Sequence, residues 1–148
     1  KRIYSHGNAA HVSQDAQSQQ VVGEVAARVY AAEACTLKAA VPAQQAYLAR
    51  FAGDDAAERA ANVAAEIESA TAQVVVSTLI QRATSELFNA LGASDVRQGK
   101  ALDRHWRNAR TVSSHNPLIY KARIVGDWVI NGTEPPFVWQ IGNGPAKA

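Results

Sequence analysis

Residues 55–91 read DAAERAANVAAEIESATAQVVVSTLIQRATSELFNAL, and this stretch decides the fold. It is rich in alanine, which strongly favours helices. Its apolar residues recur every three or four positions in two stripes, which are Val63, Ile67, Ala70 and Val74, and then Val76, Ile80, Ala83, Leu87 and Leu91. At about 1.5 Å per residue, one helix here is over about 50 Å long. Two apolar stripes predict a helix that is covered on two sides, at the centre of a bundle.

The segment before this helix predicts two further helices. The first begins at Ser13 or Asp15, either of which can cap it, and runs to about Ala40. Its apolar face is expected to carry Val22, Val25, Val29, Ala32 and Thr36. Pro42 is expected to interrupt the helix, because proline removes a backbone hydrogen bond, and a shorter helix then covers 44–51.

Capping and breaking residues mark the ends of the long helix. Asp55 and Glu58 have the spacing of a capping box, and Gly92 is placed to end the helix. After a loop at 93–100, a helix is predicted over 101–113.

Asn116 is expected to cap a last helix with Pro117 at its first position, and this helix ends near Asn131-Gly132. Residues 1–12 and 133–148 lack periodicity. We therefore predict an all-α fold, an antiparallel bundle of four helices or of five, in one domain over 1–148.

Composition narrows the class of protein. The 148 residues carry a net charge of +2 and no methionine, so we expect a piece of a longer protein. The charge predicts no nucleic-acid partner, and no apolar run approaches the roughly 20 residues that span a membrane. The single cysteine, Cys35, excludes an internal disulfide and favours a cytoplasmic location.

A basic segment precedes and enters the predicted helix at 101–113. Between positions 95 and 110 there are five Lys or Arg residues and two acids. Arg107 and Arg110 share a helix face, with Trp106 close enough to stack on Arg110. One interpretation is an anion site for phosphates. The other is a solvated face whose arginines pair with Asp103, Glu86 or a neighbouring subunit.

His115 lies at the junction of two predicted helices, in Ser-Ser-His-Asn-Pro. A histidine there can reach into a cleft and exchange a proton near neutral pH, but these residues alone favour a hydrogen-bonded surface or interface histidine. His105 has a weaker case, and His6 and His11 fall in the irregular N-terminal segment. The spacing of the four histidines predicts no metal site.

Residues 102–136, LDRHWRNARTVSSHNPLIYKARIVGDWVINGTEPP, strongly resemble the C-terminal helical domain of the acyl-CoA dehydrogenase-like flavin monooxygenases. This group is typified by dibenzothiophene monooxygenase and sulfur-acquisition oxidoreductases. The resemblance implies a C-terminal bundle that follows an N-terminal helical domain and a middle β domain, in a tetramer that is a dimer of dimers. The isolated chain is then expected to be inactive.

The resemblance also implies the chemistry. Such enzymes use molecular oxygen and reduced FMN, or FAD in some relatives, with the reduced flavin delivered by a separate NADH-dependent reductase. They oxygenate small sulfur-containing or aromatic substrates through a flavin C4a-hydroperoxide. Faces of the bundle such as the one bearing Val76 and Ile80 are expected to be buried by a partner.

Several residues match positions with known roles in that family. His115 matches a histidine at the flavin, the expected catalytic residue. Ala93 and Ser94 match a turn that touches the flavin, often from a neighbouring subunit, and Arg2 matches an arginine on the flavin phosphate. Trp106, Arg107, Asn108 and Arg110 are expected to be structural or to lie in subunit contacts, and the tail after Gly132 to close over an active site.

Two alternatives remain open. The Tyr-Glu-Gly-Thr segment with which many acyl-CoA dehydrogenases supply their base is absent, yet a dehydrogenase with FAD and a base elsewhere fits the same fold. The other alternative is a non-enzymatic helical interaction module, whose binding to nucleic acid would weaken steeply with salt.

Overall fold

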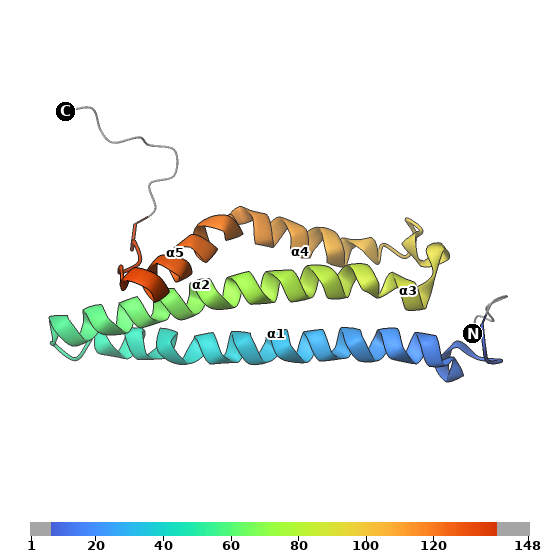
Figure 1. Ribbon diagram of the computed structural model, residues 1–148, viewed down its shortest axis with the longest axis horizontal. Coiled ribbons are helices and arrows are strands. Elements are labelled where there is room, and N and C mark those ends of the chain that lie inside the picture. The colour runs from blue at the N-terminus through green and yellow to red at the C-terminus, as the bar shows by residue number, and fades with distance from the viewer. Residues whose placement is uncertain (1–6, 139–148) are drawn as a thin grey trace, which may run out of the picture.

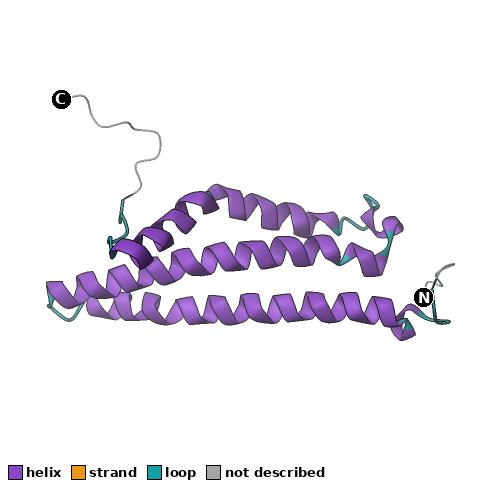
Figure 2. Ribbon diagram, viewed as in Figure 1, coloured by secondary structure: helices purple, strands orange, loops and turns teal. Residues whose placement is uncertain are grey.

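The computed structural model describes residues 7–138, and within them it contains helices and no strand (Figure 2). The helices are α1 (Ala16–Ala49), α2 (Asp55–Glu86), α3 (Phe88–Leu91), α4 (Asp103–His115) and α5 (Leu118–Asn131), with short 3-10 turns at Val12–Gln14 and Ala93–Val96. The predicted all-α fold is confirmed. The long helix over 55–91 is also confirmed, apart from a brief break at Leu87.

The helices form three antiparallel rods, with α2 in the middle (Figure 1). α1 lies along one side of α2 over most of its length, and α4 followed by α5 lies along the other side. Val63, Ala70 and Ala83 of α2 are buried, and they come from both predicted stripes. The prediction that this helix is covered on two sides is therefore confirmed.

A narrow seam joins α1 to α2. From Val21 on, the less exposed positions of α1 other than Ala31 alternate at four- and three-residue spacing, and they are Val21, Val25, Arg28, Ala32, Cys35, Ala39, Pro42, Ala46 and Ala49. This is the spacing of a coiled-coil seam, in which every seventh residue returns to the same side. Most of these side chains are small, so the two helices can approach closely.

The predicted apolar face of α1 is only partly the face that packs on α2. Val25 and Ala32 do turn toward α2, but Val22 and Val29 are about half exposed, and Thr36 is exposed. Apolar residues occur on nearly all sides of α1, so periodicity alone could not select one side. Packing selects the side with the smaller residues.

The predicted break at Pro42 is wrong, because α1 runs unbroken from Ala16 to Ala49. A proline inside a helix loses one backbone hydrogen bond and costs about 3 kcal/mol or more. The stretches of α1 on both sides of Pro42 pack against the same partner helix. Their burial offsets the loss, and a separate helix over 44–51 does not form.

Two predicted helix caps also need correction, and one is confirmed. Asp15 caps α1, and hydrogen bonds from the backbone N–H groups of Ser18 and Asn8 lower the pKa of its carboxyl. For α2 the cap is Asp54 and not Asp55, because the extended backbone of Asp54 directs its carboxylate to the first free N–H groups. Asn116 makes no capping bond, and Pro117 occupies the cap position of α5.

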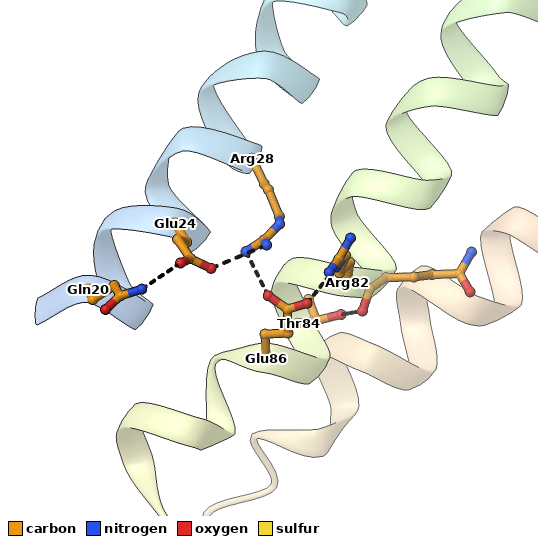
Figure 3. A network of polar contacts seen from close by, with 7 residues as sticks. Gln20, Glu24, Arg28, Arg82, Thr84 and Glu86 are labelled. Carbon is orange, nitrogen blue, oxygen red and sulfur yellow. Dashed lines mark hydrogen bonds and ion pairs between the residues drawn. The ribbon is translucent and has the colours of Figure 1, made fainter. Parts of the chain in front are cut away.

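A polar network crosses the seam near the amino end of α1 (Figure 3). Arg28 lies 2.7 Å from Glu86 of α2, and it also pairs with Glu24 one turn earlier in α1. Arg82 binds the same Glu86, and its hydrogen bond, followed by the charge of Arg28, lowers the pKa of that carboxyl. Because Arg28 occupies a seam position, sliding α1 along α2 would separate the charges. The network therefore favours one register.

By length and composition alone, one helix in the described part of the chain could also cross a membrane. It is the α2–α3 rod Asp55–Leu91, whose most apolar 18-residue window has a mean hydropathy of 1.3. The central helix of a bundle has the same composition, and this rod is flanked by α1 and by α4–α5. The absence of a membrane partner stays a prediction.

Candidate functional site

The basic segment is organised by α4, which packs on α2 through one narrow face. Ser113 is buried and Ala109 is half-buried, whereas most of the other side chains of α4 are exposed. Arg107 pairs with Asp103 within the helix at 3.4 Å, and Arg110 donates a 3.2 Å hydrogen bond to Gln81 of α2. These partners fit the structural role expected for both arginines.

His115 is the last residue of α4 and is exposed. Asn116 then takes an extended conformation and Pro117 opens α5, so the chain bends immediately after the histidine. Figure 1 shows this bend on the side of the α4–α5 rod that faces away from α1. The imidazole can therefore approach a ligand that lies outside the bundle.

The turn that bears Ala93 and Ser94 lies before α4, whereas His115 lies at its far end. The turn is well defined: Gly92 has φ +84°, and the Ser94 carbonyl accepts a 2.8 Å hydrogen bond from Arg97 Nε. α4 alone is about 20 Å long at 1.5 Å per residue. The structure does not bring the two predicted flavin contacts together within one chain. This separation fits the implied contribution of the turn from a neighbouring subunit.

His105 is exposed and borders a mostly apolar hollow of about 340 Å³, where α1, α2, α3 and the start of α4 meet. Ile80, Phe88 and Leu102 are among the residues that line this hollow. Trp106 is 42% exposed in this chain, and Arg110 binds Gln81. Trp106 is thus no buried anchor of the 148-residue bundle, and its expected role in subunit contacts stays a prediction.

The start of the tail is attached far from His115. Glu134 forms an ion pair with Arg59 near the beginning of α2, and the Arg59 guanidinium lies 5.9 Å from the Phe137 ring centroid. This attachment lies at the opposite end of α5 from His115 (Figure 1). Arg2 and residues 139–148 lie outside the described residues, so neither the phosphate contact nor closure by the rest of the tail is tested.

The surface that bears His115 contains residues that the sequence analysis did not connect with this histidine. Arg104, Asn108 and Thr111 share the side of α4 on which His115 lies, at spacings of four, three and four. That spacing was available in the sequence, but the side of the helix that packs on α2 was not known. Across residues 7–138 no group of three His, Cys, Asp or Glu side chains could hold a metal ion.

The helices and the exposed α4 surface define the chain as a helical domain with one polar face open to a ligand or a neighbour. Residues 1–118 match the family described as acyl-CoA dehydrogenase, C-terminal domain, and the chain belongs to this family.

Flavin enzymes are among its relatives. A probable FMNH2-dependent monooxygenase, SfnC of Pseudomonas putida, is 35% identical over 65 residues, which are 44% of this chain and 16% of that protein.

Two solved structures share the fold over most of the chain. The methanesulfinate monooxygenase MsuC from Pseudomonas fluorescens has a TM-score of 0.77 and 28% identity, over 92% of this chain and 34% of that one. TdsC from Paenibacillus sp. A11-2, in a complex with FMN and indole, has a TM-score of 0.73 and 28% identity, over 88% of this chain and 33% of that one. The chain thus spans about a third of the length of these structures.

The described residues fit one wall of a flavin site. A flavin needs hydrogen-bond donors for its ring and hydroxyl groups and a cation for its phosphate, and the exposed side of α4 offers His115, Asn108 and Arg104. These side chains are exposed, so the wall is open on its outer side.

Proposed function

We propose that this chain is the flavin-contacting C-terminal domain of a two-component flavin-dependent monooxygenase. The observation that carries the proposal is His115, exposed at the bend between α4 and α5, in a domain whose relatives include FMN-bound and FMNH2-dependent monooxygenases. The substrate class is a small sulfur-containing or aromatic molecule, in keeping with the methanesulfinate and indole named for MsuC and TdsC. Reduced FMN would arrive from a separate NADH-dependent reductase, with FAD as the alternative, and the location would be cytoplasmic.

In this proposal the bound reduced flavin would react with oxygen, and the product of that reaction would be a flavin C4a-hydroperoxide. The chain's own contribution would be to hold a proton at the imidazole of His115 and to place it beside the ring. The helix end that bears His115 is braced on α2 through the buried Ser113. The isolated 148 residues, with this wall alone, would be inactive.

We further propose that the full-length protein is a homo-oligomer, a tetramer arranged as a dimer of dimers. Val76 and Ile80, which were expected to meet a partner, are already half-buried within the chain. A larger apolar surface lies on α1, on the side away from α2. This outer face comprises Val22, Tyr30, Leu37, Val41, Tyr47 and Leu48 of α1, with Phe51 in the turn that follows the helix, all exposed. A continuous apolar face of this kind is normally covered by protein.

The test uses the full-length protein with anaerobically reduced FMN, to which oxygen is added while flavin absorbance is followed. In the His115→Ala variant, the absorbance of oxidised flavin should reappear faster. Substrate oxygenation should fall about a hundredfold or more, within the usual range for loss of a general acid. His105→Ala is the matched control, since His105 lies on the same helix beside the apolar hollow. Unchanged oxygenation in His115→Ala would remove the role of this residue.

The family description supports one alternative, an acyl-CoA dehydrogenase that uses FAD. It predicts that a fatty acyl-CoA reduces tightly bound FAD with no reductase present. That result, together with the absence of oxygenation, would replace the monooxygenase proposal.

A further inference from the structure

We propose that Arg104 and Asn108 extend the flavin site from His115 along α4, with Arg104 binding the FMN phosphate and Asn108 binding the ribityl chain. The inference rests on the proposed function, and it adds two ligand-binding residues. Asn108 was assigned a structural role with the neighbouring arginines. Arg104 was considered only as one of five basic residues in a possible anion site or solvated face, without a particular ligand group.

The first observation is that these side chains share one line on the helix. Positions 104, 108, 111 and 115 are separated by four, three and four residues, which places them above one another on an α-helix. Ala109 and Ser113 turn toward α2, while Arg104, Asn108, Thr111 and His115 are exposed. The line therefore forms a polar stripe on the open side of α4.

The second observation is a difference between neighbouring arginines. Arg107 pairs with Asp103, and Arg110 binds Gln81. By contrast, among residues 7–138 the side chains of Arg104, Asn108 and His115 form no hydrogen bond or ion pair. Arg107 is thus engaged within α4 and Arg110 joins α4 to α2, whereas Arg104 keeps its donors available.

The order of groups on the stripe matches the order of groups along FMN. The ring system of FMN leads through a chain of hydroxyls to a phosphate, and the stripe leads from His115 through Thr111 and Asn108 to Arg104. At 1.5 Å per residue it extends about 16 Å, with its one arginine at one end. Arginine suits phosphate because its planar donors can bind two oxygens together. Val112 is 75% exposed next to His115 and offers an apolar contact for the ring.

Riboflavin lacks the phosphate, so it isolates the contribution of Arg104. In the full-length protein, the affinities of reduced FMN and reduced riboflavin are measured anaerobically for wild type, Arg104→Gln and Asn108→Ala. Arg104→Gln should weaken FMN about tenfold or more and leave riboflavin nearly unchanged, because a hydrogen bond to a charged group typically contributes that much. Asn108→Ala should weaken both flavins by similar factors, since both carry the ribityl chain.

Arg107→Gln is the matched control, because it removes the same charge from the same helix at a position that already has a partner. Riboflavin affinity also reports whether Arg104→Gln is folded. The inference is overturned if Arg104→Gln keeps the wild-type ratio of FMN to riboflavin affinity, most clearly if Arg2→Gln abolishes that ratio. A wild-type protein that binds neither flavin overturns the proposed function itself, so the two failures can be told apart.

Discussion

α1 and α4 pack on opposite sides of the same central helix, yet they present opposite surfaces to the outside. α1 turns small side chains such as Ala32 toward α2 and leaves large apolar ones exposed, among them Tyr30 at 76% and Leu37 at 63%. α4 also turns a small residue, Ser113, toward α2, but it exposes arginines, an asparagine and a histidine.

The difference indicates what covers each surface in the full-length protein. When protein covers a large apolar side chain, the free energy of the assembly falls by about 25 cal/mol per Å² of apolar surface removed from water. Guanidinium and imidazole groups lose hydration unless a charged or polar partner replaces the water. We therefore expect protein to cover the outer face of α1 and a polar ligand to lie on α4.

The largest effect is expected on the outer face of α1. Tyr30→Glu combined with Leu37→Glu should dissociate the full-length assembly, because each buried apolar side chain contributes about 1.5–3 kcal/mol and a buried unpaired carboxylate adds a further cost. Light scattering after size-exclusion chromatography measures the mass. Gln45→Glu, at an exposed position of the same helix, is the control. An unchanged mass for the double variant would show that the outer face of α1 does not lie in an interface between copies of the chain.

The inner face of α1 should respond through stability. Ala32 is 3% exposed in the seam, so Ala32→Leu should overpack it and lower the free energy of unfolding by about 1–3 kcal/mol. Urea unfolding followed by helical circular dichroism measures the change. Ala26→Leu places the same side chain at an exposed position and should change little. Equal effects of the two variants would contradict the assignment of the seam.

A smaller effect is expected at the start of α2, the helix on which both α1 and α4 pack. Asp54→Ala should lower the free energy of unfolding by about 1 kcal/mol, because two backbone N–H groups lose their acceptor. Asp55→Ala tests the capping box that the sequence predicted at that residue. A lower melting temperature for Asp55→Ala than for Asp54→Ala would contradict the assignment of Asp54 as the cap of α2.

The smallest effect is a pH dependence at the seam network. The folded-state pKa of Glu86 lies below its ordinary value of 4.5, so its contribution to stability is present above that value and is lost as pH falls through the folded pKa. Glu86→Gln lacks this contribution. The difference in melting temperature between wild type and Glu86→Gln should therefore be larger at neutral pH than well below pH 4.5. A difference that does not vary with pH would mean that the ion pair with Arg28 and Arg82 is absent in solution.

Several features of the fold were readable in the sequence because they depend on neighbouring residues alone. The long helix before Gly92 and the end of α5 at Gly132, whose φ is +69°, are set by alanine content and by glycine's freedom to take left-handed backbone conformations. The continuous helix through Pro42 was missed, because burial on both sides of the proline outweighs its local penalty. Two of the three predicted caps were displaced by one residue, which is the usual error of reading boundaries from sequence.

For the candidate site, the sequence was sufficient to single out His115 and the arginines around it, through the motif they share with a known family. It could not distinguish Arg104 from Arg107 and Arg110, since that requires the side chains to which each is joined. The order of the predicted elements already placed the turn at Ala93 and Ser94 and His115 at opposite ends of the helix that is α4.

The sequence by itself therefore determined the helices, the two-sided burial of α2 and the family to which the chain belongs. Each follows from local propensity, from the spacing of apolar residues or from a motif. Only the tertiary structure decided which side of α1 meets α2 and which polar side chains of α4 remain open. The physical reason is that an alanine-rich helix has apolar surface on most sides, so close packing against a particular partner, and not periodicity, selects the buried face.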